Sequence, residues 1–145
     1  MIDYRLLEEL RLMIVCQWGE PSHEEIQTMR RKLATDLGPT ISYDVIVDAS
    51  RIDTLLAMNE FGPLLAGRII AVARPIKLAI ISGFEDVAFG VQRQFATLAE
   101  RDMPDVDIRV FRDLPPALDW LGHAAVDVAS LIADMVPDGH KATDA

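Results

Sequence analysis

Basic residues, long apolar runs and cysteines are all in short supply in this chain of 145 residues. Its 14 Lys and Arg residues are outnumbered by 23 Asp and Glu residues, which gives a net charge of −9. Because that charge repels a phosphate backbone and no basic stripe offsets it, we expect neither nucleic acid nor an anionic membrane as a partner. No apolar run approaches the ~18 residues that cross a bilayer, and residues 1–5 lack the layout of a signal peptide. We therefore expect no transmembrane segment and a cytoplasmic protein.

The single cysteine, Cys16, excludes an internal disulfide and every Cys-x-x-Cys metal or redox site. It ends an apolar run that starts at Leu12, where a buried and unreactive thiol is more common than a nucleophile. The sequence has no Gly-x-Ser-x-Gly elbow, and residues 82–86 lack the glycines and the lysine of a phosphate-binding loop. No recognisable catalytic motif is present, so the sequence predicts a protein that is not an enzyme.

The three histidines, His23, His123 and His140, lie in separate parts of the chain rather than in a cluster. The helix start at His23 begins like a zinc-protease motif, but Gln27 stands where the second histidine ligand is needed. His123 has no second ligand in register. The sequence therefore predicts no metal site and no cofactor.

Half of the residues are apolar, enough for one domain that buries roughly 70% of the surface of its unfolded chain. We expect this domain to cover residues 2–136 and a disordered tail to follow over residues 137–145. Expected strands cover residues 2–7, 10–17, 43–50, 76–82 and 106–112, although the first pair also fits one face of a helix. Expected helices follow the caps Ser22, Asp86 and Asp113, and two more cover residues 59–73 and 124–136.

Residues 43–50 form the strand around which we expect the chain to be organised. Three β-favouring aliphatic residues follow one another without a helical period, and the strand ends in polar residues. In open α/β sheets, ligands and partners meet the loops at the carboxyl ends of such interior strands. The candidate partner or switch loop therefore contains Asp48, Ser50, Asp53 and Thr54. These side chains also suit turn and cap hydrogen bonds, which is their more common role.

Two expected helices carry more apolar surface than one small sheet needs to cover. Residues 59–73 are apolar nearly all round, and residues 124–136 have one narrow polar stripe formed by Asp127, Ser130 and Asp134. Such helices usually pack against something besides their own sheet. We therefore place a candidate apolar interface or pocket at Phe61, Leu65, Ile69, Val128, Leu131, Ile132 and Met135.

Several short phrases, in this order along the chain, resemble the SpoIIAA-like proteins of the STAS superfamily, also described as STAS/SEC14-like. The phrases are Tyr43-Asp-Val-Ile-Val-Asp48, Ala88-Phe89-Gly90 and Val110-Phe111-Arg112-Asp113-Leu114, the last leading to Trp120-Leu121. The likeness covers most of residues 2–122. It implies an α/β fold, namely a SpoIIAA/STAS-like mixed β-sheet of about five strands with α-helices packed mainly on one side, and a role in binding rather than catalysis.

In the anti-sigma-factor antagonists of that superfamily, a serine in an Asp-Ser-Ser-Gly-like turn soon after the central strand is phosphorylated, and this switches partner binding. The corresponding stretch here, residues 53–57, has no such turn and offers only the hydroxyl of Thr54. The resemblance therefore does not carry the phosphorylation switch over to this chain.

Two functional hypotheses follow from these observations. The first is a noncatalytic STAS-like interaction or signalling module of unknown partner that forms a homodimer through an apolar helix. The second is a carrier or sensor of a lipid-like or other apolar small molecule, held between the sheet and residues 59–73 and 124–136.

Overall fold

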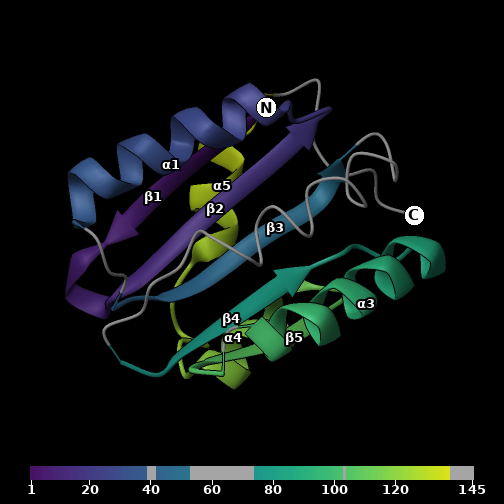
Figure 1. Cartoon of the computed structure of the whole chain (residues 1–145). Helices are drawn as coiled ribbons and strands as arrows, with labels where there is room; N and C mark the ends of the chain where they lie inside the picture. Colours follow the sequence, from purple (N-terminus) through teal and green to yellow (C-terminus); the bar gives the residue numbers. More distant parts are fainter. Residues whose placement is uncertain (39–41, 53–73, 103, 138–145) are drawn as a thin grey trace.

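A five-stranded mixed sheet organises the chain, with the strands side by side in the order of the sequence (Figure 1). The structure, a computed structural model, describes residues 1–38, 42–52, 74–102 and 104–137. Within these ranges the strands are β1 (Ile2–Leu7), β2 (Leu12–Gly19), β3 (Asp44–Ile52), β4 (Ile76–Ile81) and β5 (Val106–Phe111). β1 pairs with β2 in antiparallel fashion, whereas β2, β3, β4 and β5 run parallel to one another. The interior position predicted for residues 43–50 is therefore confirmed, and β4 is interior as well.

The first two strands form a hairpin, which confirms the strand interpretation over the helical alternative. A short 3-10 helix, η1 (Glu8–Leu10), joins them and ends at Arg11 in the left-handed conformation, with φ of 49°. All residues of β2 are buried. A strand covered on both faces has no polar side to display, which explains why its sequence shows no alternation.

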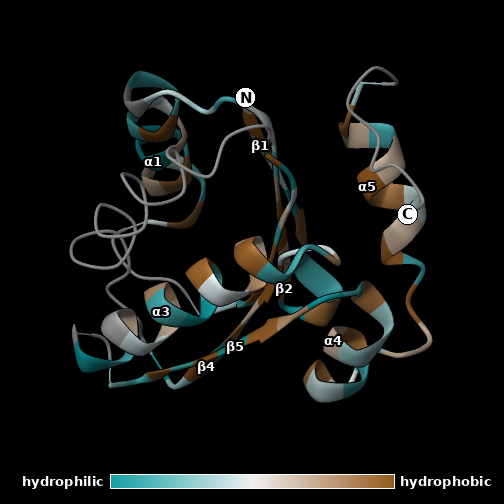
Figure 2. Ribbon diagram, turned by 90° about the vertical axis from the view of Figure 1, so that its right-hand side faces the viewer, coloured by the Kyte–Doolittle hydropathy of each residue, from teal (hydrophilic) through white to brown (hydrophobic). Residues whose placement is uncertain are grey.

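The helices cover both faces of the sheet (Figure 2). On one face lie α1 (His23–Leu37) and α3 (Asp86–Asp102), and on the other lie α4 (Leu114–Leu121) and α5 (Val128–Met135). Each face has its own apolar core, with Met13 and Val15 of β2 facing α1 and α3, and Ile14 and Cys16 facing α4 and α5. The α/β class and the mixed five-stranded sheet are confirmed. The described helices are shared more evenly between the faces than we expected.

Local capping fixes where these helices start and stop. The Ser22 hydroxyl accepts a hydrogen bond from the Glu25 N–H at 3.1 Å, as an N-cap should. The Asp113 carboxylate accepts one from the Leu114 N–H at 2.8 Å, and two prolines fit the first turn of α4. Gly122 ends α4 with φ of 81°, in the left-handed region that glycine enters without strain. The predicted starts of α1 and α4 are confirmed.

The last helix is shorter than predicted, because it starts at Val128 rather than at residue 124. Asp127 caps it, accepting hydrogen bonds from the Ser130 N–H at 3.2 Å and from the Ser130 hydroxyl at 2.7 Å. These two bonds lower the pKa of the Asp127 carboxyl. Asp127 and Ser130 thus form a cap instead of part of a helical polar stripe.

Three sequence-based predictions fall partly or wholly outside the described residues. They are the helix over residues 59–73, with Phe61, Leu65 and Ile69; the loop residues Asp53 and Thr54; and the tail after residue 137.

Candidate functional site

Asp48 and Ser50 come together within the last five residues of β3, which runs on to Ile52, so these two residues of the predicted loop lie in the strand. The Asp48 side chain is buried, and its Oδ1 accepts hydrogen bonds from the Ser50 N–H at 3.0 Å and from the Ser50 hydroxyl at 2.6 Å. Its Oδ2 forms an ion pair with the guanidinium of Arg51. Asp48 is therefore a buried anion with three donors around it, an arrangement that orders the end of the strand.

An extra residue in β3 brings Arg51 to this cluster. Cys16 is in register with Asp48, but the next matched pair is Trp18 with Arg51, so β3 advances by three residues while β2 advances by two. Such a bulge re-aims the side chains that follow it. It places Arg51 on the α5 face of the sheet with Asp48, where strict alternation would have placed it on the opposite face.

Two buried N–H groups near this cluster have no acceptor among the described residues, namely Trp18 Nε1 and Arg51 Nε. Trp18 is 7% exposed, and it is the register partner of Arg51. Buried donors of this kind are usually satisfied by a bridging water molecule. These two N–H groups therefore make this end of the core polar, but they do not identify a ligand.

No activated nucleophile stands beside Asp48 among the described residues. Burial raises the pKa of the Cys16 thiol to about 12, and the Asp48 charge raises it further than Arg51 lowers it. The thiol lies 3.9 Å from the Met135 sulfur and stays protonated near neutral pH. Ser50 donates its hydroxyl proton to a carboxylate that is already paired with Arg51. Within the same ranges, no group of three His, Cys, Asp or Glu side chains is arranged to hold a metal ion.

The segment from the end of β4 to the first turn of α3 lies against Ser50 of β3 and carries two exposed apolar residues, Phe84 and Val87. A Cβ placed on Gly83 would lie 3.4 Å from the Cβ of Ser50, so the two backbones approach closely. Phe84 is 65% exposed and Val87 is 63% exposed. Two large apolar side chains that stay exposed within four consecutive residues are informative, since most large apolar side chains are buried.

Arg112 holds this loop in place. Its guanidinium donates to the Phe84 carbonyl at 3.0 Å, pairs with Asp86 at 2.8 Å and lies 4.3 Å from the centre of the Phe89 ring. Sequence reasoning considered residues 82–86 only as a phosphate-binding loop and missed the apolar pair. Nothing in the sequence distinguishes an exposed Phe or Val from a buried one at a helix start.

The predicted apolar interface on the last helix belongs mainly to the core. Val128, Ile132 and Met135 are 0%, 4% and 7% exposed, and they pack on the face of the sheet that contains Cys16. Leu131 is half-buried against the same cluster. The surface of the monomer therefore offers little of this helix's apolar side to a partner.

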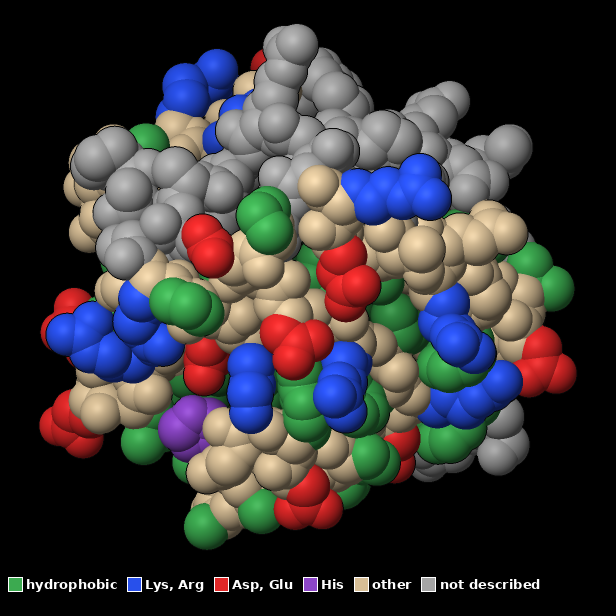
Figure 3. Space-filling view, turned by 60° about the horizontal axis from the view of Figure 1, so that its bottom comes forward, with side chains coloured by type: hydrophobic (Ala, Val, Ile, Leu, Met, Phe, Trp, Pro, Cys, Tyr) green, Lys and Arg blue, Asp and Glu red, His purple; other side chains and the backbone are tan. Residues whose placement is uncertain are grey.

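Charged side chains of both signs are mixed with hydrophobic ones on the face shown in Figure 3, where Lys and Arg groups stand beside Asp and Glu groups. Lys77 and Arg109 both make cation–π contacts with Trp120, and their charged groups lie 5.2 and 5.1 Å from the centre of its ring. Such contacts fix α4 on the sheet. This face offers no continuous basic area for a polyanion.

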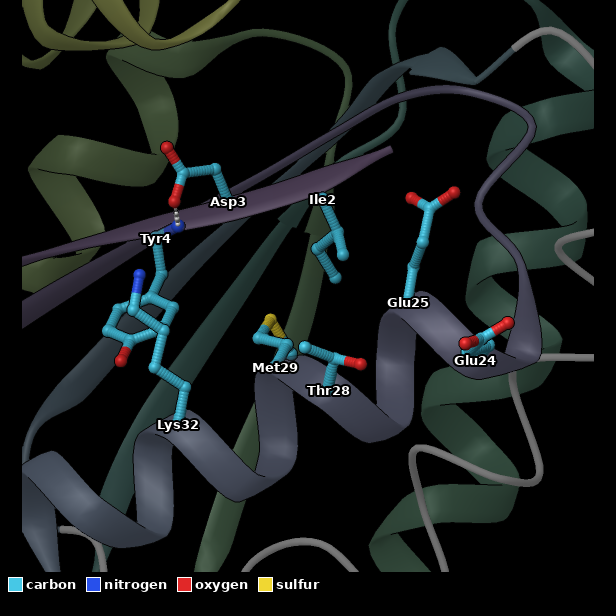
Figure 4. Close-up of a pocket in the computed structure, with 8 residues that line it drawn as sticks. All are labelled: Ile2, Asp3, Tyr4, Glu24, Glu25, Thr28, Met29 and Lys32. Atoms are coloured by element: carbon cyan, nitrogen blue, oxygen red, sulfur yellow. Dashed lines mark hydrogen bonds between the residues drawn. The ribbon is translucent and has the colours of Figure 1, made fainter.

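A hollow of about 320 Å³ lies between β1 and α1 (Figure 4). Its lining includes the charged residues Asp3, Glu24, Glu25 and Lys32, with Ile2 and Met29 as apolar members. Three carboxylates against one ammonium make the hollow acidic.

In the described part of the chain, no helix combines the length and apolar character needed to span a membrane.

The geometry defines an α/β protein with a mixed five-stranded sheet covered on both faces and polar residues ordered at its carboxyl end. A solved structure identifies the fold more closely: an uncharacterised protein of the DUF3478 family from Shewanella loihica PV-4, described as having a SpoIIAA-like fold, is similar with a TM-score of 0.53 and 22% sequence identity. The similarity covers 83% of this chain and 92% of that one. The chain thus has a SpoIIAA-like fold, as its resemblance implied. No protein-family model and no curated protein matches it.

Proposed function

We propose that this chain is a noncatalytic interaction module that forms a homodimer through the exposed pair Phe84 and Val87. The observation that carries the proposal is that two large apolar side chains, three residues apart in the chain and each about two-thirds exposed, lie in the segment that follows the carboxyl end of β4. The end of β3, ordered by the hydrogen bond between Ser50 and Asp48, packs closely against Gly83 at the start of this loop. A pre-ordered loop loses little conformational freedom on binding, which favours association.

The surroundings of the pair suit a symmetric contact. In a two-fold dimer the same patch meets its own copy, so an apolar centre needs a rim that carries both charges. Asp86 and Arg112 supply such a rim, because each could pair with the opposite residue of the second copy. Each chain carries a charge of −9, so salt should strengthen the dimer by screening the repulsion between copies.

Nothing in the described residues favours the alternative role as a carrier of an apolar small molecule. The apolar side of α5 is packed on the sheet, and the hollow beside β1 is lined by four charged side chains. A lipid-like ligand would leave those charges without water or partners, which is unfavourable.

Sedimentation velocity of the wild type and of the double variant Phe84→Ser/Val87→Ser tests the proposal. We expect a dimer for the wild type and a monomer for the variant, with unchanged circular dichroism because both side chains lie on the surface. Leu10→Ser is the matched control, since Leu10 is also an exposed large apolar residue but lies at η1. A wild type that stays monomeric at high micromolar concentration, with and without salt, would rule out the homodimer.

A further inference from the structure

β1 is an edge strand with a regular row of backbone groups that point away from the sheet. The Met1 and Trp18 backbones exchange two hydrogen bonds, at 2.6 and 2.9 Å, so they form a hydrogen-bonded pair of the antiparallel ladder. Alternation along the ladder then directs the N–H and C=O groups of Ile2, Tyr4 and Leu6 outward. An edge of this kind is a template for one more strand.

One of these outward groups is already occupied. The Asp3 carboxylate accepts the Tyr4 N–H at 2.8 Å, and Figure 4 shows Asp3 turned away from α1 to make this bond. In the described part of the chain, the outward groups of Ile2 and Leu6 have no such partner. Asp3 therefore protects the middle of the edge and leaves its two ends open.

Helix α1 runs beside this edge and forms the second wall of the hollow. Figure 4 shows Glu25, Met29 and Lys32 rising from α1 toward β1, while Ile2 and Tyr4 reach toward the helix. Lys32 lies 5.2 Å from the centre of the Tyr4 ring, so its charge is held at one end of the hollow. The other end is acidic.

That acidic end comes from the first turn of α1. Glu24 is exposed, and Glu25 is half-buried with the Met1 amine 3.2 Å from its carboxylate. Among the described residues that line the hollow, no Lys or Arg stands beside Glu24 and Glu25. A cationic side chain brought next to Ile2 would therefore meet the Glu24 carboxylate and, beside it, the Glu25 carboxylate that the Met1 amine already contacts.

We propose that the hollow between β1 and α1 binds an extended basic segment of another protein, which adds a strand to β1. Its backbone would pair with Ile2 and Leu6, and its alternate Lys or Arg side chains would meet Glu24 and Glu25. A basic segment suits this edge better than a second copy of this chain, because the copy carries a charge of −9 and its own β1 supplies no pair of basic side chains for Glu24 and Glu25. This surface is separate from Phe84 and Val87, so the inference does not depend on the homodimer.

Fluorescence anisotropy with a labelled peptide of alternating Lys and Val residues tests this inference on the full chain. We expect Glu24→Gln/Glu25→Gln to weaken peptide binding by about fivefold at low salt, since each surface ion pair contributes modestly. Glu8→Gln/Glu9→Gln removes the same charge from η1 and should change affinity less than about twofold. Equal weakening by both double variants would overturn the proposal, because general attraction to an acidic protein would then explain the binding.

Methylated peptides separate strand addition from charge. Two versions of the peptide are made, one N-methylated at the odd-numbered residues and the other at the even-numbered residues. Each keeps every side chain, but each lacks the backbone N–H donors along one edge of the extended peptide. One version should lose about tenfold or more in affinity, because several backbone hydrogen bonds disappear. If both methylated versions bind as tightly as the parent peptide, strand addition is overturned. Phe84→Ser/Val87→Ser should bind the parent peptide like the wild type, and loss of binding there would place the site away from β1 and also overturn the proposal.

Discussion

The carboxylate of Asp48 and the guanidinium of Arg51 form an ion pair inside the carboxyl end of β3. The Asp48 side chain is 3% exposed and that of Arg51 is 18% exposed, so the pair is largely out of water. Removing one member of such a pair leaves the other charge buried without its partner, which is far more unfavourable than losing a surface ion pair.

We therefore expect Arg51→Met to lower the free energy of unfolding by about 2–4 kcal/mol. Asp48→Asn should have a smaller effect, because the amide oxygen can still accept from Ser50 and the Arg51 charge left behind is 18% exposed, whereas the Asp48 side chain is 3% exposed. Urea denaturation of both single variants and of the double variant would give the coupling energy. If the two effects simply add, Arg51 is not stabilised by Asp48 and the ordered turn needs another explanation.

The Cys16 thiol should make stability depend on pH above about pH 9. Its pKa in the folded state is about 12, whereas an ordinary thiol has a pKa near 9.0, so the unfolded chain loses this proton first as the pH rises. Stability from the neutral thiol is complete below pH 9 and is lost toward pH 12. From about pH 9 to about pH 10, the wild type should lose about 1 kcal/mol more than Cys16→Ala in urea denaturation.

A second group cancels in this comparison. Burial and the hydrogen bond to Asp36 raise the pKa of the Tyr4 hydroxyl above its usual value of 10.0, so its contribution begins as the tyrosine of the unfolded chain ionises near pH 10, but the wild type and Cys16→Ala both carry Tyr4. Equal slopes for the wild type and Cys16→Ala would contradict a buried, protonated thiol.

The core position of α5 predicts a contrast between neighbouring residues on one helix. Ile132 is 4% exposed in the core beneath α5, whereas Ala133 is exposed. We expect Ile132→Ala to lower the free energy of unfolding by about 2–4 kcal/mol through the cavity it leaves, and Ala133→Ser to change it by less than about 0.5 kcal/mol. Thermal or urea unfolding checks both values. A small effect of Ile132→Ala would mean that α5 is loosely attached and free to meet a partner.

Local chemistry made much of the fold predictable. The apolar runs that start at Leu12 and Ile76 matched the expected strands, and Ser22 and Asp113 fixed two helix starts through bonds to nearby N–H groups. These features depend on residues a few positions apart, which a sequence displays directly. The position of β3 at the centre of the sheet followed from the same reasoning.

The candidate site was less predictable, because its geometry depends on a change of register. Asp48 and Ser50 could be selected from the end of the strand, but Arg51 could not, since alternation places it on the other face until the bulge turns it back. Ile132 and Phe84 show the second limit. Both are large apolar residues near helices, yet one lies in the core and the other in water, and that outcome is set by the tertiary packing of distant segments.

The bond between Asp3 and the Tyr4 N–H gives the last prediction, which concerns how the chain protects its sheet edge. Asp3→Asn removes the charge but keeps an oxygen that can accept from Tyr4, whereas Asp3→Ala removes both. The two variants have the same net charge, so any difference between them reports on the freed N–H. We expect Asp3→Ala to bind the alternating Lys and Val peptide about fivefold more tightly than Asp3→Asn, the effect of roughly one hydrogen bond. Equal affinities would mean that Asp3 does not restrict strand addition at β1.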